Sequence, residues 1–475
     1  MPIDLDEMFD ALGRQADAVP LGGADRARQR GRRRNRVRAV VSVAAAVVLV
    51  AVGAGITLRH PDREALPIDK VIQGTPIPQV GETIDMGGPA AHSIVATDGK
   101  RAYVTWLNAE DNGTQVKAAD LETGAPAWDA AQPVVDPLRA LDRLVVVPSA
   151  VLVVTEARDD TKPAVGLHAF DPLTGVPLWS REVEAADTLV FAADMLVQLT
   201  ARTGRVDGYD WVSGAARWSR TEGAPVTRAV GMAIPDDEAK TNRAGPPLTF
   251  SDGRIVLLTG DTAEVRNAAT GDLQRTVPMS APTRGTAVAY DGWLFTHDEA
   301  DDSPGPQSIR AIDLAGSNST SIVLEKLPGR FVAMNACGIN RVCVITVTEQ
   351  VRKVTAIDAR KRQVLWQRDS SLSGDELSSA SGATLVTSET GSVELFNASG
   401  ELQFKSTMIG GWLDARSLLV VMPDGTGRLA RLVTTDARLS PYDRHISDVD
   451  GSCTSTAQRL VCAGRTSGLR TWKLG

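Results

Sequence analysis

The sequence lacks the residue patterns that mark common catalytic and metal sites. None of its five histidines stands in a Ser-His-Asp or metal-ligand spacing, and no glycine-rich loop that could cradle a phosphate precedes a helix. The histidines are scattered along the chain as His60, His92, His168, His297 and His445. These absences argue against the common hydrolases, zinc enzymes and nucleotide-binding enzymes.

The main body of the chain also lacks positive charge. Residues 1–38 hold nine Arg and six Asp or Glu, whereas the remainder holds 42 Lys or Arg and 52 Asp or Glu, a net charge of −10. Phosphate backbones are bound by basic surfaces. The acidic body therefore excludes nucleic acid as the expected partner.

Aromatic residues are scarce, and tryptophan is over-represented among them. Only 4% of the 475 residues are aromatic, yet nine of these are Trp. Four of them close a similar phrase: "ADLETGAPAW" ends at Trp128, "FDPLTGVPLW" at Trp179, "YDWVSGAARW" at Trp218 and "IDARKRQVLW" at Trp366. A phrase repeated in this way indicates a repeating structural unit.

Each copy of the phrase has the chemistry of a β-hairpin. Short alternating runs flank a Thr-Gly or Ser-Gly turn, in which an Asp side chain can accept hydrogen bonds from turn amides and the Gly can take a positive φ. The Trp lies on the returning strand, where it can cover the neighbouring unit. The structural positions are Asp120, Gly124, Trp128, Asp171, Gly175, Trp179, Asp210, Gly214, Trp218, Asn267, Gly271, Asp358 and Trp366.

The spacing of these anchors predicts a β-propeller. The Asp or Asn recurs every 39 to 57 residues, as Asp120, Asp171, Asp210, Asn267, Asp313, Asp358 and Asn397, with a weaker copy at Asp436. Two further strand-like runs lie between successive hairpins, which gives four strands per unit. Helical periodicity is almost absent from this region, which argues against parallel βαβ units.

The phrase resembles the tryptophan-docking repeat of the PQQ-like, or quinoprotein-type, β-propeller family. The two strong copies are residues 118–128 and 169–179, and about five degraded copies extend the resemblance over roughly residues 90–475. Among the degraded copies, 266–275 lacks the Trp, 356–366 has Arg362 where Gly belongs, and 396–404 has its Gly one position early. The resemblance implies an all-β propeller fold.

The same family includes PQQ-dependent dehydrogenases, but the resemblance does not reach their cofactor site. Many of these enzymes are larger and carry adjacent cysteines beside the quinone, with a Ca²⁺ ion held by carboxylate and Asn side chains. This chain has four cysteines and no adjacent pair. We therefore expect neither a cofactor nor a resident metal.

We predict a single propeller of about eight four-stranded blades over residues 91–475. The C-terminal tail supplies three strand-like runs without a final hairpin, so a strand from residues 78–90 is expected to complete the last blade. If the tail is a separate unit, the number of blades becomes nine.

The N-terminal part predicts a membrane anchor ahead of the propeller. Residues 39–58 carry no charge and could cross a bilayer as one helix, and the eight arginines within 26–38 favour a cytoplasmic N-terminus. Residues 1–38 would then be a cytoplasmic basic tail and the Pro-rich residues 59–90 a stalk with the possible closing strand. A cleaved signal peptide is the alternative.

The four cysteines predict two disulfides outside the cytoplasm. "CGINRVC" and "CTSTAQRLVC" each place two cysteines around a hairpin turn, which pairs Cys337 with Cys343 and Cys453 with Cys462. Four buried thiols are the alternative. Neither pair forms a CxxC metal motif.

Two acidic stretches are the best metal candidates, and both have the composition of solvated loops. They are "HDEADD" at 297–302 and "DDE" at 236–238. The long variable stretches 155–166, 234–248 and 298–308 are expected between strands, where binding surfaces usually lie.

Together these features predict a non-enzymatic, membrane-tethered, extracytoplasmic propeller that binds a protein or another envelope ligand. The alternatives are a PQQ-dependent dehydrogenase-like quinoprotein and an envelope sensor that signals through the short N-terminal tail. The sequence does not identify the ligand.

Overall fold

A computed structural model defines the fold of the C-terminal part of the chain. It describes residues 75–475 with these gaps: 89, 109–112, 129–131, 135–138, 158–163, 221–222, 234–250, 280–284, 298–306, 316–319, 350, 375, 381, 389–390, 413–416, 422–425, 434–437, 451, 457, 465–467 and 475. All the described residues belong to one compact unit, Glu64–Gly475. The expected tail and anchor, residues 1–58, lie outside the described residues. Within the described part, no helix has the length and apolar character needed to cross a membrane.

The described part of the chain is all-β, and its strands form consecutive antiparallel groups. Blade 1 contains β3 (Ala90–Thr97), β4 (Arg101–Asn108), β5 (Thr114–Asp120) and β6 (Gln132–Val134). Blade 2 contains β7 (Arg139–Val147), β8 (Ala150–Ala157), β9 (Ala164–Phe170) and β10 (Pro177–Glu184). Blade 3 contains β11 (Thr188–Phe191), β12 (Met195–Thr200), β13 (Arg205–Asp210) and β14 (Ala216–Arg220).

The next three blades repeat this four-strand order. Blade 4 contains β15 (Arg228–Ala233), β16 (Ser251–Leu258), β17 (Thr262–Asn267) and β18 (Leu273–Pro278). Blade 5 contains β19 (Ala287–Tyr290), β20 (Trp293–His297), β21 (Ile309–Asp313) and β22 (Thr320–Leu324). Blade 6 contains β23 (Arg330–Ala336), β24 (Arg341–Thr348), β25 (Val351–Asp358) and β26 (Gln363–Ser370).

Three blades remain, and the last of them contains strands from both ends of the described chain. Blade 7 contains β27 (Glu376–Ala380), β28 (Ala383–Thr387), β29 (Val393–Phe396) and β30 (Leu402–Ser406). Blade 8 contains β31 (Ile409–Trp412), β32 (Ser417–Val421), β33 (Gly427–Val433) and β34 (Arg438–Ile446), with β1 (Thr75–Pro76) added in parallel beside β34. Blade 9 contains β35 (Cys453–Ser455), β36 (Arg459–Ala463), β37 (Leu469–Lys473) and β2 (Gln79–Ile84).

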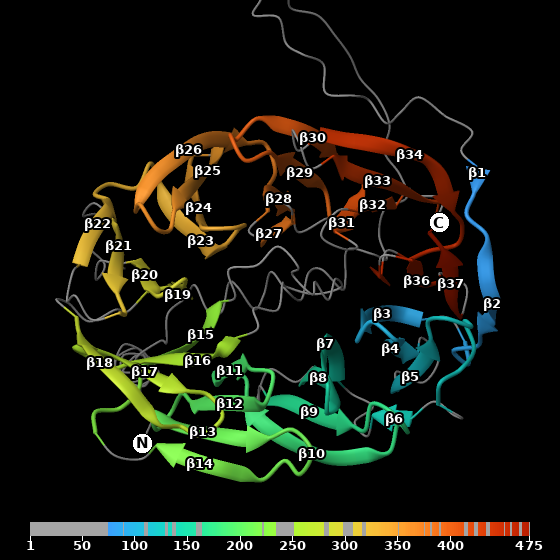
Figure 1. The fold of residues 1–475 in the computed structure, drawn as a ribbon, viewed down its shortest axis with the longest axis horizontal. Coiled ribbons are helices and arrows are strands. Elements are labelled where there is room, and N and C mark those ends of the chain that lie inside the picture. The colour runs from blue at the N-terminus through green and yellow to red at the C-terminus, as the bar shows by residue number, and fades with distance from the viewer. Residues whose placement is uncertain are drawn as a thin grey trace, which may run out of the picture. The chain divides into compact units, whose positions relative to one another are not determined.

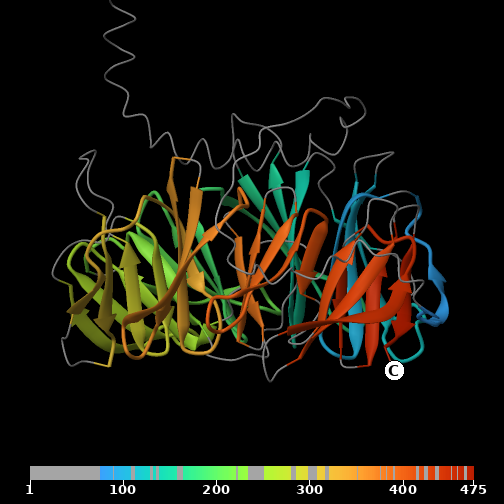
Figure 2. The ribbon, with the colours of Figure 1, turned by 90° about the horizontal axis from the view of Figure 1, so that it is seen from above.

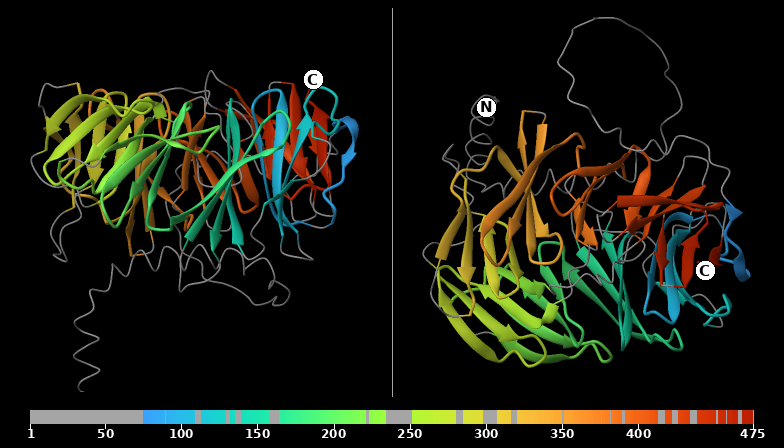
Figure 3. Two further views of the ribbon diagram at one scale, coloured as in Figure 1. Left: turned by 90° about the horizontal axis from the view of Figure 1, so that it is seen from below. Right: turned by 45° about the horizontal axis from the view of Figure 1, so that its top comes forward.

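The blades follow one another around a common centre, with the first strand of a blade innermost and the fourth at the rim (Figure 1). Since neighbouring strands within a blade are antiparallel, the turn between the first and second strands lies at the same end of the blade as the turn between the third and fourth. We call this end of the propeller the docking end. Views across the ring show the strands running between the two ends (Figures 2 and 3).

Each blade is buried on both faces because it packs against a blade on either side. In β8, Val151 and Val153 pack toward blade 1, whereas Leu152 and Val154 pack toward blade 3. Side chains alternate between the faces of a strand, so a strand with two buried faces needs a continuous apolar run. This explains why β8 begins with "AVLVV" instead of an alternating pattern.

The hydrophobic clusters show that the ring is closed. One cluster lies between each consecutive pair of blades from 1 to 9. A further cluster joins blade 9 to blade 1, where Val461 and Leu469 pack with Val104 and Trp106. Closure leaves no blade face open to solvent.

The predicted closing strand is confirmed, and the predicted number of blades is corrected. Within residues 78–90, β2 pairs with β37 through Gln79 opposite Trp472 and Val80 opposite Thr471. The described residues form nine four-stranded units: six sheets have four strands, one carries β1 as a fifth, and one joins blades 4 and 5 through parallel β15 and β19. The anchors predict eight blades because blade 9 takes its fourth strand from β2 and so has no anchored hairpin.

Candidate functional site

The chemistry shared by the copies of the repeat lies in the turns at the docking end. In blade 2, Asp171 Oδ1 accepts hydrogen bonds from the amides of Leu173 (2.9 Å) and Thr174 (2.8 Å) and from the Thr174 hydroxyl (2.9 Å). Asp120 and Asp210 bind their own turns in the same way. The carboxylates that the repeat carries are therefore occupied in holding the turns.

These hydrogen bonds lower the pKa of the turn carboxyls. The Thr123 amide is the main cause of the lowered pKa of Asp120. Partial burial alone would raise the pKa of Asp171, but the donors of Thr174 and Leu173 outweigh it, and the pKa is lowered. The Ser213 amide likewise lowers the pKa of Asp210, helped by Arg217.

The turn glycine packs directly against the ring of a tryptophan from the preceding blade. Gly175 has a φ of 75°, and a Cβ atom there would lie 2.6 Å from Cδ2 of Trp128. Gly214 has the same relation to Trp179. Gly271 receives Trp218, and Gly400 receives Trp366 although its turn is one residue shorter. Glycine is required both for the left-handed conformation and for the contact.

The docked tryptophans also bond to the next blade. Trp179 Nε1 donates to the carbonyl oxygen of Trp211 at 2.7 Å, which is the residue directly after the anchor Asp210. The same bond runs from Trp128 to Pro172 (3.3 Å), from Trp218 to Ala268 (2.9 Å) and from Trp366 to Ala398 (3.0 Å). We call the acceptor, one residue after each anchor, the linking residue.

In blades 1, 4, 5 and 6, the residue directly after the anchor also ties the two turns of its own blade together. The amide of Ala268 donates to the carbonyl oxygen of Gly253 at 2.8 Å, and Ala359 donates to Asn340 at 2.8 Å. Leu121 and Leu314 donate in the same way to Lys100 and Gly292. At Ala268, which also accepts from Trp218, one residue therefore connects the preceding blade, the outer hairpin and the inner hairpin.

Two arginines take the place of the tryptophan, and the sequence did not identify them. Arg275 stands eight residues after Asn267, where the repeat has Trp, and its Nη1 donates to Leu314 O at 3.5 Å. Arg459 Nε donates to Leu121 O at 2.9 Å and so joins blade 9 to blade 1. The position of Arg275 in the phrase was a usable signal, whereas Arg459 lies outside any copy of the phrase.

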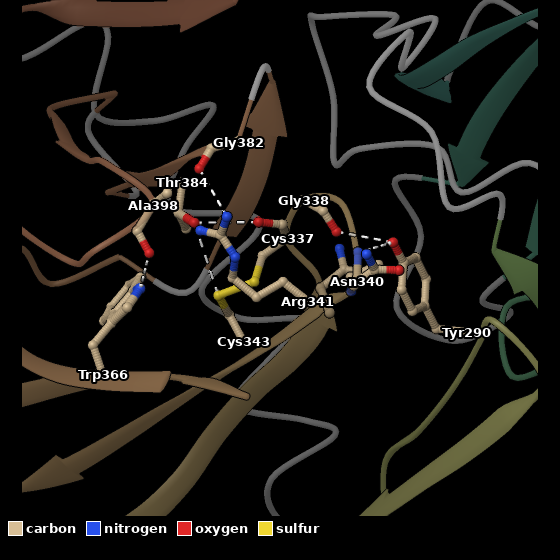
Figure 4. Close-up of a disulfide and its surroundings, with 12 residues drawn as sticks. Tyr290, Cys337, Gly338, Asn340, Arg341, Cys343, Trp366, Gly382, Thr384 and Ala398 are labelled. Atoms are coloured by element: carbon tan, nitrogen blue, oxygen red, sulfur yellow. Dashed lines mark hydrogen bonds between the residues drawn. A yellow bond between two sulfur atoms is a disulfide. The ribbon is translucent and has the colours of Figure 1, made fainter. Parts of the chain in front are cut away.

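The joint between blades 5 and 6 has a different construction. Arg362, which replaces the turn glycine, has a φ of 56°, and its guanidinium lies 4.3 Å from the centroid of the Trp293 ring in blade 5. Arg360 Nε lies 2.7 Å from Asp291 Oδ2. The Tyr290 hydroxyl donates to Gly338 O at 2.9 Å and accepts from the Asn340 amide at 2.8 Å (Figure 4). Charged and polar contacts thus replace the docked indole.

Both predicted disulfides are present. Cys337 is bonded to Cys343 and Cys453 to Cys462, and all four side chains are buried. The first disulfide closes the turn between β23 and β24, and this turn is also held by blade 7. There, Thr384 Oγ1 donates to Cys337 O at 3.2 Å and Arg341 Nη2 donates to Gly382 O at 2.9 Å (Figure 4).

The sequence candidates for ligand binding do not come together. His297 is the last residue of β20, 3% exposed and stacked on Phe331, so it does not begin an exposed loop as the sequence suggested. Residues 298–302 and 236–238 lie outside the described residues. His168 Nδ1 lies 3.2 Å from the Ser180 hydroxyl, and His92 is an exposed residue of β3.

A quinone site of the dehydrogenase type does not fit the residues present. Within the described ranges, no group of three or more His, Cys, Asp or Glu could hold a metal ion. The disulfides lie in the cores between blades 6 and 7 and between blades 8 and 9, and the repeat carboxylates accept bonds from their own turns. We derive no chemistry through such a cofactor.

Exposed apolar side chains collect on the outer hairpins. Among the described residues, the exposed large apolar side chains are Leu173, Val176, Val212, Leu273, Ile322, Ile339, Val351, Val364, Leu365 and Leu402. All but Ile339 and Val351 belong to the turn and fourth strand of an outer hairpin.

The long stretches expected between strands are flanked by strand ends at opposite ends of the propeller. The strands on either side of 234–250 end at the docking end, whereas the strands on either side of 158–163 and of 298–306 end at the opposite end.

Comparison with known proteins identifies relatives of the repeat. Residues 73–320 match the family described as outer membrane protein assembly factor BamB. No curated protein sequence matches the chain.

Many solved structures are similar in fold at low sequence identity. BamB from Moraxella catarrhalis is 14% identical, with a TM-score of 0.43, and the match covers 82% of this chain and all of that one. Sqt1 from Chaetomium thermophilum is 14% identical, with a TM-score of 0.41 and coverage of 70% and 95%. Hsv2 from Kluyveromyces lactis is 12% identical, with a TM-score of 0.39 and coverage of 64% and 98%.

Proposed function

Because the chain belongs to the family described as outer membrane protein assembly factor BamB, we propose that it is a non-enzymatic β-propeller that binds other proteins in the cell envelope. The family description names the assembly of outer membrane proteins. We carry over only the binding of proteins, and we expect the uncharged residues 39–58 to attach this chain to the membrane as a spanning helix.

The observation that carries this proposal is the use of the repeat residues in joints between blades. The anchor Asp171 holds its turn, Gly175 receives Trp128, and Trp128 bonds to Pro172. A catalytic site needs convergent polar groups that are free to act on a substrate. Here the distinctive polar groups fix the turns, and a fixed turn that exposes apolar side chains suits the binding of a partner.

The proposal includes a location. Residues 39–58 would anchor the chain in the cell membrane, residues 1–38 would lie in the cytoplasm, and the propeller would face the extracytoplasmic side. The arginines of residues 26–38 support this orientation, since cytoplasmic flanks are enriched in Lys and Arg.

Site-specific photo-crosslinking in the cells that make the protein tests the proposal. The full chain would carry p-benzoylphenylalanine in place of Leu173 or, separately, Val212, whose side chains are 59% and 50% exposed. The proposal predicts discrete protein adducts at one or both positions. A matched control carries the same residue in place of buried Leu152, which should give no intermolecular adduct. Absence of adducts at both exposed positions would contradict a protein-binding role for this surface.

A further inference from the structure

The outer hairpin of blade 6 carries an unusual positive charge. Residues 351–370, from β25 to β26, contain six Lys or Arg and two Asp, a net charge of +4. Counted over the same two strands and their turn, the hairpins of blades 1 to 5, 7 and 8 carry between −2 and +2. The whole chain carries −7, so the residues outside this hairpin carry −11.

Part of this charge lies at the exposed turn. The turn after Asp358 reads Arg360-Lys361-Arg362, where the strong copies of the repeat have Glu122 or Leu173 followed by Thr-Gly. The side chain of Arg360 is 64% exposed and Lys361 is also exposed. The packing of Arg362 on Trp293 and the ion pair of Arg360 with Asp291 place two of these cations in the joint between blades 5 and 6, but that joint does not require Lys361.

Exposed apolar side chains lie beside these cations. Val364 and Leu365 on β26 are 42% and 48% exposed. Ile339, 44% exposed, lies in the turn between β23 and β24, and the bond from the Ala359 amide to Asn340 O brings that turn beside the basic one. The turn and fourth strand of blade 6, with the adjoining turn between β23 and β24, therefore carry exposed cations and exposed aliphatic side chains. We call Ile339, Arg360, Lys361, Val364 and Leu365 the blade 6 surface.

The backbone that carries this surface is held from several directions. Asp358 Oδ1 accepts from the amides of Arg360 (3.0 Å) and Lys361 (2.8 Å). On β26, Trp366 bonds to blade 7, as does Arg368, whose Nε lies 2.9 Å from Gly400 O. The Cys337–Cys343 disulfide closes the turn that carries Ile339 (Figure 4). Such a surface loses little conformational entropy when it binds a partner.

We propose that the blade 6 surface binds an acidic segment of a partner protein that also carries apolar side chains. The inference rests on the proposed function and names the chemistry of one partner. Charge complementarity selects an acidic partner, and the exposed aliphatic side chains supply area that is buried on contact.

A protein segment explains this surface better than an anionic bilayer does. A flat bilayer would meet several blades of the docking end at once. The turns of other blades at that end carry exposed Glu122, Asp194 and Asp272, which anionic lipid would repel. Cations confined to one blade match a narrow partner.

The first experiment places p-benzoylphenylalanine at exposed Gln363 in the full chain, in the cells that make it, so that every cation of the surface is kept. The expected result is a protein adduct whose crosslinked segment has a negative net charge and contains apolar residues. The double variant Arg360→Glu and Lys361→Glu should abolish this adduct.

The second experiment measures affinity. A fluorescein-labelled synthetic peptide with the crosslinked sequence is titrated with the full chain and followed by fluorescence anisotropy. The Arg360→Glu and Lys361→Glu variant should weaken binding about tenfold or more, and added salt should weaken binding to the unaltered chain. The matched control, Lys100→Glu with Lys326→Glu, makes the same change in net charge at two other exposed lysines and should stay within about twofold.

Several outcomes would overturn the inference. They are no adduct at position 363, an adduct whose segment is neutral or basic, an adduct with a second copy of this chain, an adduct with lipid alone, and equal effects of the two double variants. If position 363 fails while positions 173 or 212 give protein adducts, the proposed function stands and this inference falls.

Discussion

The indole nitrogen of Trp179 lies 2.7 Å from the carbonyl oxygen of Trp211, and this hydrogen bond joins blade 2 to blade 3. The ring of Trp179 also contacts Gly214, which lies in the turn that follows Trp211. The carboxylate of Asp210 holds this turn by accepting a hydrogen bond from the amide of Ser213. The Trp of one copy of the phrase and the Asp and Gly of the next copy therefore act at one joint.

Trp179→Phe should remove the donor and keep most of the apolar contact. The carbonyl of Trp211 loses its partner, so the free energy of unfolding should fall by about 0.5–1.5 kcal/mol. Trp179→Ala should cost more, about 3–5 kcal/mol, because the apolar contact is lost as well. Urea unfolding followed by circular dichroism measures both. Leu173→Ala, at an exposed side chain, is the control and should change stability by less than about 0.5 kcal/mol.

Gly214→Ala should destabilise the protein through its contact with Trp179. A Cβ atom at Gly214 would lie 2.6 Å from Cγ of Trp179, and the residue has a φ of 65°. Gly99 has a φ of 93° with no atom within 4 Å of the added Cβ, so Gly99→Ala isolates the cost of the backbone conformation. Gly214→Ala should cost about 1–3 kcal/mol more than Gly99→Ala in urea unfolding. Equal costs would show that the indole does not rest on this glycine.

Stability should fall in acid because the turn carboxyls have lowered pKa values. The pKa of Asp171 in the folded chain lies below its ordinary value of 3.8. Its stabilising effect is therefore complete above pH 3.8 and is lost as the pH falls through the lower, folded value. Asp171→Asn keeps an acceptor oxygen, as Asn267 does toward Ala269, but cannot titrate. Urea midpoints at pH 7 and pH 3 should differ less in this variant than in the unaltered chain. An unchanged difference would mean that this turn does not contribute to acid sensitivity.

Loss of the Cys337–Cys343 disulfide should loosen two joints at once. The double variant Cys337→Ala and Cys343→Ala should lose about 2–4 kcal/mol of stability. Because the closed turn bonds to Tyr290 and Thr384, hydrogen exchange should rise in β19 and β28. Removing the Cys453–Cys462 disulfide is the matched control, which should destabilise blade 9 without raising exchange in β19 or β28. Identical exchange patterns in the two variants would contradict this account.

The sequence predicted the joints that depend on one local phrase. Asp171, Gly175 and Trp179 stand at fixed spacings because each must reach a set position in a hairpin of standard geometry. The cysteine pairs could also be read from the sequence, since a short hairpin brings both ends of the segment together.

The remaining features depend on contacts between distant parts of the chain. Arg459 bonds to a residue 338 positions away, and any long donor could have filled that place. Counting anchors gives eight blades, because blade 9 takes its fourth strand from β2 and has no anchored hairpin of its own. The packing of Arg362 on Trp293 could not be predicted, because the absence of the turn glycine at position 362 does not indicate which contact replaces the docked indole.

Titration of the full chain with PQQ and Ca²⁺ tests most directly whether the propeller is a quinoprotein enzyme instead of a non-enzymatic binding protein. Isothermal titration calorimetry measures binding of the quinone, and an artificial electron acceptor reports oxidation of alcohols or sugars in the same sample. The account predicts neither saturable quinone binding nor turnover above a protein-free control. Stoichiometric binding at about micromolar affinity, or reproducible turnover, would contradict it.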